Sequence, residues 1–339
     1  MSGRFESALN KALEAPYGIP ASTIAGMLVY DDPGFETDLF AAAREVKTRC
    51  GKTSVLPRGL IEVSNVCSRD CLYCGIRRSN AKTARYSLSE DQVAACIDEA
   101  RRRGYPAVAF QAGEVASEAN TCFYERIIRR CRGLEVTLSL GEQTEDVYRR
   151  WKDAAGDGVL RYLIRIETSN RELFSAIHPA GQSFDGRLAC IRTLKRLGYV
   201  TGSGVMIGLP GQTAADLAAD IVFFGRERLD MVGMGPFVPH ADTPLGRTSD
   251  VVSAEARLSL ALRMIALTRL YLHGVNIVAA SALEALDPVA GRSRGIDAGA
   301  NVIMPVLTPS NRRAAYDLYP GKARCAEEIS NPVFNARSP

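Results

Sequence analysis

Three of the nine cysteines lie within eight residues, at Cys67, Cys71 and Cys74. Random placement of the cysteines would give this C-x3-C-x2-C spacing only roughly 0.006 times per chain. The spacing therefore indicates a metal site. A closed zinc site needs four protein ligands, and no further Cys or His lies nearby. Three thiolates fit an iron-sulfur cluster better, because one iron then stays open for chemistry. A zinc site completed by a distant residue and three structural thiols remain as alternatives.

The other six cysteines are scattered. We expect five of them to pack as small hydrophobic side chains, at Cys50, Cys96, Cys122, Cys131 and Cys190. Cys325 stands alone near the C-terminus, and one cysteine cannot make a site. The odd count argues against a disulfide scaffold, and no N-terminal segment has the apolar run of a secretory signal. We therefore expect reduced thiols, a cytoplasmic location and no membrane-spanning segment.

The composition is that of a globular protein, with 46% hydrophobic and 24% charged residues among 339. Disorder, collagen and coiled coil are excluded. The net charge is +4, and many arginines form pairs, such as Arg77 with Arg78 and Arg149 with Arg150, that acidic residues separate. No basic stripe alternates with aromatic residues. These pairs therefore predict solvated helix faces and no nucleic-acid partner.

Short apolar runs alternate with helical patterns from Leu60 onward. The expected strands are residues 60–63, 107–111, 135–139, 161–167, 204–208, 231–235, 275–279 and 301–304. The expected helices are residues 89–103, 118–132, 144–154, 183–197, 213–226, 254–273 and an interrupted 283–299. Eight such units predict an α/β fold, a closed (β/α)8 TIM barrel. We expect an N-terminal helical extension over 1–50, the barrel over 51–322 and a C-terminal tail over 323–339.

Polar residues gather where the predicted strands end, which is where barrel enzymes place their active sites. The first strand leads into the cysteine loop. The next strands end in Gln111 with Glu114, in Ser139 with Glu142, and in Arg165 with Glu167. Each of these is weak alone, because Glu142 fits a plain helix-start acid equally well. Their joint position indicates a site at the barrel mouth.

The triplet, with Tyr73 directly before its last cysteine, resembles the signature of radical S-adenosylmethionine (SAM) enzymes. Further segments resemble the HydE family of iron-iron hydrogenase maturases, which is related to biotin synthase and methylornithine synthase. They are residues 61–67, 74–78, 137–142, 161–170, 208–213, 230–240, 298–305 and 316–322. The likeness covers about Arg58 to Lys322, nearly the whole barrel.

This resemblance implies a radical SAM enzyme that holds a 4Fe-4S cluster on Cys67, Cys71 and Cys74. It implies SAM contacts at Tyr73, Gln111, Gly113, Glu114, Ser139, Glu167 and Arg187, the last facing the SAM carboxylate. It places substrate-side residues at Arg58, Arg165, Ser281, Tyr316 and Tyr319. Arg58 and Arg165 would face an anionic ligand in the barrel.

Several positions differ from the HydE pattern. Ile166 stands where a His is usual, Ala280 and Ser281 replace a Thr pair, and Val306 replaces an Asn. We expect these residues to line the substrate side of the barrel. The C-terminal cysteines that hold an auxiliary cluster in some members are absent, apart from Cys325. The SAM machinery is thus expected to be intact, whereas the substrate is left open.

The leading hypothesis is a HydE-type maturase that acts on a cysteine-bound iron carbonyl cyanide precursor. An alternative is a HydE-like or methylornithine-synthase-like enzyme that acts on a small amino acid or thiol. A third is a non-enzymatic iron-sulfur scaffold. The expected partners of the enzyme are a small-molecule or small organometallic substrate, a reductant such as flavodoxin or ferredoxin, and other hydrogenase maturation proteins.

Overall fold

The computed structural model describes residues 5–248 and 251–322. Its main sheet has eight strands in the order β10-β1-β2-β3-β4-β5-β7-β9, and all of their pairings are parallel. The strands are β1 Leu56–Ser64, β2 Ala107–Ala112, β3 Glu135–Ser139, β4 Leu160–Leu163, β5 Val200–Ser203, β7 Met231–Val232, β9 Asn276–Ile277 and β10 Val302–Ile303. A two-stranded parallel sheet, β6 Met206–Ile207 with β8 Gly235–Pro236, extends β5 and β7.

The first and last strands of the sheet join through the backbone. A parallel bridge links Val278 to Val302. Ala279 N donates to Val302 O at 2.9 Å, and Asn301 N donates to Ile277 O at 3.0 Å. The sheet therefore closes into a barrel, and the predicted (β/α)8 fold is confirmed.

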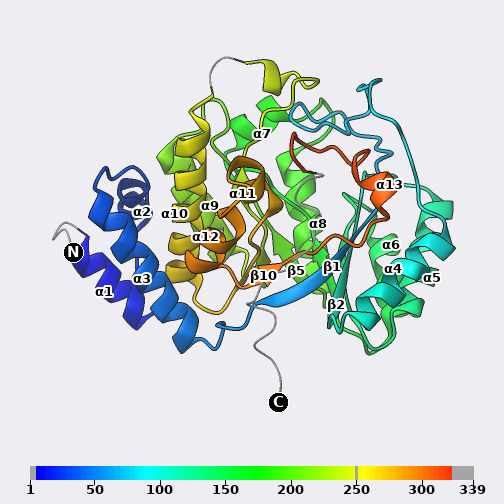
Figure 1. The fold of residues 1–339 in the computed structure, drawn as a ribbon, viewed down its shortest axis with the longest axis horizontal. Coiled ribbons are helices and arrows are strands. Elements are labelled where there is room, and N and C mark those ends of the chain that lie inside the picture. The colour runs from blue at the N-terminus through cyan, green and yellow to red at the C-terminus, as the bar shows by residue number, and fades with distance from the viewer. Residues whose placement is uncertain (1–4, 249–250, 323–339) are drawn as a thin grey trace.

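Helices surround this barrel (Figure 1). The first three precede it: α1 Glu6–Glu14, α2 Ala21–Leu28 and α3 Pro33–Arg49. The others are α4 Glu90–Arg102, α5 Glu118–Arg130, α6 Glu145–Ala155, α7 Arg171–Ile177, α8 Phe184–Arg196, α9 Ala214–Arg226, α10 Ala254–Leu272, α11 Ser281–Leu286, α12 Gly291–Asp297 and α13 Ser310–Arg313, with a 3₁₀ turn at Leu245–Arg247. Helices α2 and α3 pack on α9 and α10 at one side of the barrel.

Helix starts follow their sequence signals. Ser89 forms the predicted capping box with Gln92, and the Ser253 side chain accepts from Ala256 N at the start of α10. A second capping box joins Thr213 and Asp216. These caps satisfy backbone N–H groups that have no partner inside the helix. They fix the points at which the chain leaves the barrel rim.

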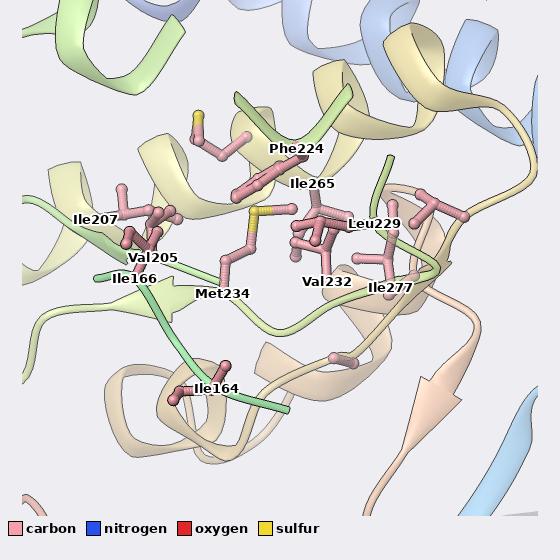
Figure 2. Close-up of a cluster of buried hydrophobic side chains, with 14 of the residues drawn as sticks. Ile164, Ile166, Val205, Ile207, Phe224, Leu229, Val232, Met234, Ile265 and Ile277 are labelled. Carbon is pink, nitrogen blue, oxygen red and sulfur yellow. The ribbon is translucent and has the colours of Figure 1, made fainter. Parts of the chain in front are cut away.

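Successive strand residues point to opposite faces of the sheet, which separates two kinds of core. The outward side chains pack against the helices in one large cluster, part of which lies between the strands, α9 and α10 (Figure 2). The inward side chains include a small cluster of Leu60, Ala109 and Val306. On β1, Arg58 and Glu62 share the inward face with Leu60.

The fifth barrel strand begins earlier than expected. The sequence predicts residues 204–208, whereas the structure has β5 at Val200–Ser203 and a separate β6 at Met206–Ile207. A Cβ on Gly204 would lie 1.8 Å from Gly233 O, so the two backbones approach too closely for any side chain. Thr201 and Ser203 interrupt the apolar run, but both are fully buried. Their burial explains why apolar periodicity located this strand poorly.

None of the helices in residues 5–248 and 251–322 is both long and apolar enough to cross a bilayer. The predicted C-terminal tail and Cys325 lie outside the described residues.

Candidate active site

The cysteine triplet lies in the loop of residues 65–88 that connects β1 to α4. All three thiols are free and partly buried. Burial raises the pKa of Cys67, and it raises the pKa of Cys71 to about 12. The pKa of Cys74 is raised for the same reason, and Cys71 raises it further. A thiolate here is therefore costly without a positive charge to face it, and iron supplies such a charge.

The loop is built to present sulfur to a bound group. Cys67 Sγ accepts from the backbone N–H groups of Arg69 at 3.4 Å and of Glu114 at 3.3 Å. Such donors stabilise negative charge on sulfur. Within the described residues, no three Cys, His, Asp or Glu side chains are arranged to hold a single metal ion. A 4Fe-4S cluster does not require three ligands around one metal ion, because each thiolate binds its own iron. The donor set fits such a cluster.

The end of β2 holds this loop in place. Gly113 N donates to Ser64 O at 2.9 Å, and Ser68 N donates to Glu114 O at 2.8 Å. A Cβ on Gly113 would lie 2.2 Å from Val66 O and 2.7 Å from the Cβ of Cys67. Glycine is therefore required at Gly113 for the strand to approach the cysteine loop.

A chain of polar contacts leads from Cys71 into the barrel rim. The Cys71 thiol donates to Gln182 Oε1 at 3.6 Å, and Gln182 Nε2 donates to Glu142 Oε1 at 3.2 Å. Arg187 Nε also donates to Glu142 Oε1, at 2.6 Å. Both Gln182 and Arg187 are buried. The family resemblance implies that Arg187 faces the SAM carboxylate, and in this structure the carboxylate that faces it is Glu142.

Glu114 is fully engaged by the cysteine loop and its neighbour. One carboxylate oxygen pairs with Arg69 Nε, and the other accepts from Glu142 N at 2.9 Å. Burial raises the pKa of Glu114, while Glu142 N and Arg69 act against that effect. Glu114 thus connects the cysteine loop to the start of the segment after β3.

Tyr73 is fixed by a buried histidine. Its OH lies 3.1 Å from His178 Nε2, and His178 Nδ1 lies 2.8 Å from Phe174 O. Because a carbonyl only accepts, Nδ1 carries the proton and Tyr73 donates to Nε2. Burial and Arg187 lower the pKa of His178 to about 4, so the imidazole stays neutral near pH 7. This contact therefore ties the cysteine loop, through Tyr73, to His178 at the end of α7.

The other predicted SAM contacts lie at the strand ends. Gln111 and Ser139 are register partners on β2 and β3 and are half-buried. Glu167 is buried and has a φ of 66°, which is rare for a residue with a side chain. Its carboxylate lies 2.9 Å from Arg165 Nη2 as an ion pair without hydrogen-bond alignment. Arg165 Nη2 also donates to Val205 O at 2.8 Å.

The barrel interior is cationic near the N-terminal ends of its strands. Arg58 is 4% exposed and donates to Met231 Sδ at 3.5 Å, on a strand that is not its neighbour. Burial lowers the pKa of Arg58 to about 10, and the charge of Arg161 adds to the effect. Arg161 pairs with Glu135 at 2.7 Å. Arg58 thus faces the interior, at the end of β1 opposite the cysteine loop.

Two of the predicted substrate-side residues, Ser281 and Tyr319, contact each other. A third, Tyr316, lies in the hydrophobic core. Ser281 Oγ lies 2.7 Å from Tyr319 OH. Tyr316 is 1% exposed and belongs to the main hydrophobic core, with Lys322 Nζ 5.9 Å from its ring centroid. Lys322 in turn pairs with the buried Glu62. Tyr316 therefore lies in the core beside this ion pair.

Two expectations are wrong. Ile166 does not line the substrate side: it is fully buried in the outward core with Val205 and Ile207 (Figure 2). Val306 does lie in the inward cluster.

Cys122 is not a core thiol, because it is half-exposed on α5 and its Sγ contacts Glu118 Oε1 at 3.0 Å. Its helix position faces charged neighbours rather than the sheet. Cys96 and Cys131 are buried as expected.

Sequence reasoning missed several groups of this site. Gln182, His178 and Arg161 carried no motif of their own. The alternation along β4 could have indicated Arg161, because residues 161, 163 and 165 must share one face. Nothing local indicates Gln182 or His178, since both reach the cysteine loop from more than 100 positions away.

Comparison with known proteins agrees with this geometry. Residues 61–224 match the model of the radical SAM superfamily. The chain is 42% identical over 297 residues to the [FeFe] hydrogenase maturase subunit HydE of Thermotoga maritima, which covers 87% of this chain and 82% of that protein. The chain belongs to the HydE family of radical SAM enzymes. Members of the superfamily carry a 4Fe-4S cluster and bind SAM, and so does this enzyme.

More distant relatives share its fold. The 3-methylornithine synthase of Methanosarcina barkeri is 25% identical, over 91% of this chain and 85% of that protein. The crystal structure of methylornithine synthase (PylB) aligns with a TM-score of 0.75 at 21% identity, covering 87% of this chain and 85% of that one. The hydrogenase maturase HydG from Carboxydothermus hydrogenoformans aligns with a TM-score of 0.75 at 18% identity, covering 90% and 71%. These two structures support the fold alone.

Proposed function

We propose that this HydE-family enzyme assembles the diiron site of iron-iron hydrogenase, acting on a small cysteine-bound iron carbonyl cyanide precursor. The 42% identity to a HydE maturase supports the pathway. The buried polar atoms without hydrogen-bond partners support the kind of substrate. Within the described residues these include Thr137 Oγ1, Arg161 Nε and Arg165 Nε, all on residues of the inward face of β3 and of the β4 segment. Unpartnered polar atoms inside a barrel favour a polar ligand, and the charges of Arg161 and Arg165 are already balanced by Glu135 and Glu167.

The residues divide into two groups by position. We assign Cys67, Cys71 and Cys74 to the cluster, and we assign the SAM contacts to Tyr73, Gln111, Gly113, Glu114, Ser139, Glu167 and Arg187. A 4Fe-4S cluster held by these three cysteines would supply the electron for reductive cleavage of SAM. Arg58 and Arg165 would hold the anionic substrate below, with Ser281 and Tyr319 at the rim. The closed barrel would keep water from the radical formed from SAM.

The eight free thiols among the described residues suit a reducing cytoplasm.

The test is complementation of hydrogenase maturation. A host that lacks its own HydE-type protein would express iron-iron hydrogenase with its other maturation proteins and this chain. We expect active hydrogenase from the wild type and none from Cys71→Ser. Cys122→Ser is the matched control, because that thiol lies on α5 away from the triplet, and it should retain activity.

The alternative substrate class makes a different prediction. The similarity to 3-methylornithine synthase, 25% identity over 91% of the chain, supports a small amino acid as the substrate of this enzyme. Reconstituted enzyme with SAM, reductant and lysine should yield no methylornithine. Its formation, together with failed complementation, would replace the maturase proposal. A scaffold protein would release no 5′-deoxyadenosine at all.

A further inference from the structure

Glu167 has an unusual backbone conformation for a residue with a side chain. Within residues 5–248 and 251–322, four residues other than glycine have a left-handed φ: Tyr17, Glu167, Arg228 and His273. Three of them follow the C-terminal ends of α1, α9 and α10, where a left-handed residue commonly ends a helix. Glu167 instead lies between β4 and α7. Its conformation is strained for a residue with a Cβ, so the surrounding structure must fix it.

The neighbouring strand segment holds Glu167 from one side. Glu167 N donates to Gly204 O at 3.0 Å, and Met206 N donates to Glu167 O at 3.0 Å. The Glu167 side chain is buried beside Arg165 on the inward face. Within the described residues, Glu167 Oε2 has no hydrogen-bond partner. This oxygen is therefore left to accept a hydrogen bond from a ligand, as the assignment of Glu167 to SAM requires.

Two carboxylates of α9 hold the turn that follows Glu167. Ser169 N donates to Asp220 Oδ1 at 2.5 Å, and Asn170 Nδ2 donates to Asp216 Oδ1 at 2.8 Å. Asp216 and Asp220 are four residues apart, so they lie on one face of the helix. Asp216 also belongs to the capping box that begins α9. Asp220 lies in the middle of the helix, where it is fully buried, and its hydrogen bond is to this turn.

We propose that Asp220 is a positioning residue for SAM binding. Its acceptor oxygen holds Ser169 N and thereby keeps Glu167 in the left-handed conformation that presents its carboxylate to SAM. Without that acceptor, Ser169 N would lack a partner at a part-buried position. The turn would then relax, and Glu167 would return to a negative φ that moves its carboxylate.

This inference rests on the SAM contact that the proposed function assigns to Glu167, and not on the substrate of the maturase. SAM binding can be measured with no substrate present. Failed complementation would therefore leave the role of Asp220 standing. Glu167→Ala tests the assigned contact by itself and should weaken SAM binding at least as much as any change at Asp220.

The experiment compares two variants of one residue, Asp220→Ala and Asp220→Asn. Alanine removes the acceptor, whereas asparagine keeps an oxygen for Ser169 N. The control is Thr268→Ala, which also truncates a fully buried polar side chain, on α10. Urea unfolding of each variant checks that it folds, and Asp220→Val, which is closer in size, replaces Asp220→Ala if alanine does not.

Two measurements on the reconstituted enzyme report the role of Asp220. The first is hydrogen exchange of residues 167–170 before SAM is added, and the second is the dissociation constant of SAM from equilibrium dialysis without reductant. In Asp220→Ala the exchange should be faster and SAM should bind roughly tenfold more weakly. At saturating SAM with dithionite, its rate of 5′-deoxyadenosine formation should stay within about twofold of the wild type.

Asp220→Asn and Thr268→Ala should match the wild type in SAM binding and in the exchange of residues 167–170. Unchanged SAM binding in Asp220→Ala would overturn the proposal. An equal loss in Asp220→Asn would also overturn it, because the acceptor would then not be the cause, and so would an equal loss in Thr268→Ala. Unchanged SAM binding in Glu167→Ala would overturn it at the assigned contact instead.

Discussion

Asp220 is a buried carboxyl group, and no cationic side chain in the described part of the chain forms an ion pair with it. It lies on α9 with no exposed surface, and its Oδ1 accepts from Ser169 N at 2.5 Å. Its Oδ2 has no hydrogen-bond partner within the described part of the chain. Burial raises the pKa of Asp220 to about 7, Ser169 acts against this shift, and the charge of Asp216 on the same helix adds to it. The charged form is therefore destabilised in the folded state.

This shift predicts how stability depends on pH. Because the folded state binds the proton more tightly than the unfolded state, stability is lost as pH rises through the folded pKa. Moving the pKa from 3.8 to about 7 corresponds to up to roughly 4 kcal/mol of lost stability above pH 7. This loss of stability is absent below about pH 4 and grows as the pH rises from about 4 to about 7.

Asp220→Asn removes the charge and keeps an acceptor for Ser169 N. The variant should be more stable than the wild type near pH 8, by up to roughly 4 kcal/mol, and the advantage should shrink towards pH 5. Urea unfolding of both proteins across this range measures the difference. Titration of the other carboxyl groups cancels from it, because both proteins share them. A difference that stays constant with pH would refute the reasoning.

Two further predictions concern a close backbone contact at Gly113 and the hydrogen bonds of the buried Arg269. Gly113→Ala places a Cβ 2.2 Å from Val66 O, so the cysteine loop must move and the iron and sulfide content after reconstitution should fall. Gly274→Ala, with nothing within 4 Å of the added Cβ, should keep its full content; equal contents would contradict the steric argument. Arg269→Met leaves the carbonyls of Gly299 and Val275 without their donor, which should cost about 3 kcal/mol or more in urea unfolding. Arg126→Met removes an exposed pair with Glu90 and should cost less than about 1 kcal/mol; similar losses would contradict a special role for Arg269.

Local patterns in the sequence determined the chemistry and the fold class. Cys67, Cys71 and Cys74 lie close together along the chain, so their spacing alone indicates a shared ligand. The capping box at Ser89 also needs only neighbours within three residues. Alternating apolar runs predicted the barrel, because each unit must bury one face of a strand and one face of a helix.

Only the tertiary structure decided which side chains face the site. Arg165 and Ile166 were both expected on the substrate side, yet adjacent residues of an extended segment point to opposite faces. Ile166 packs outward against the helices. Long-range partners were equally hidden: Glu142 meets Arg187 across 45 positions, and Gln182 reaches Cys71 across 111. Such pairs depend on how the closed barrel brings separate loops to one rim, and no local pattern records that distance.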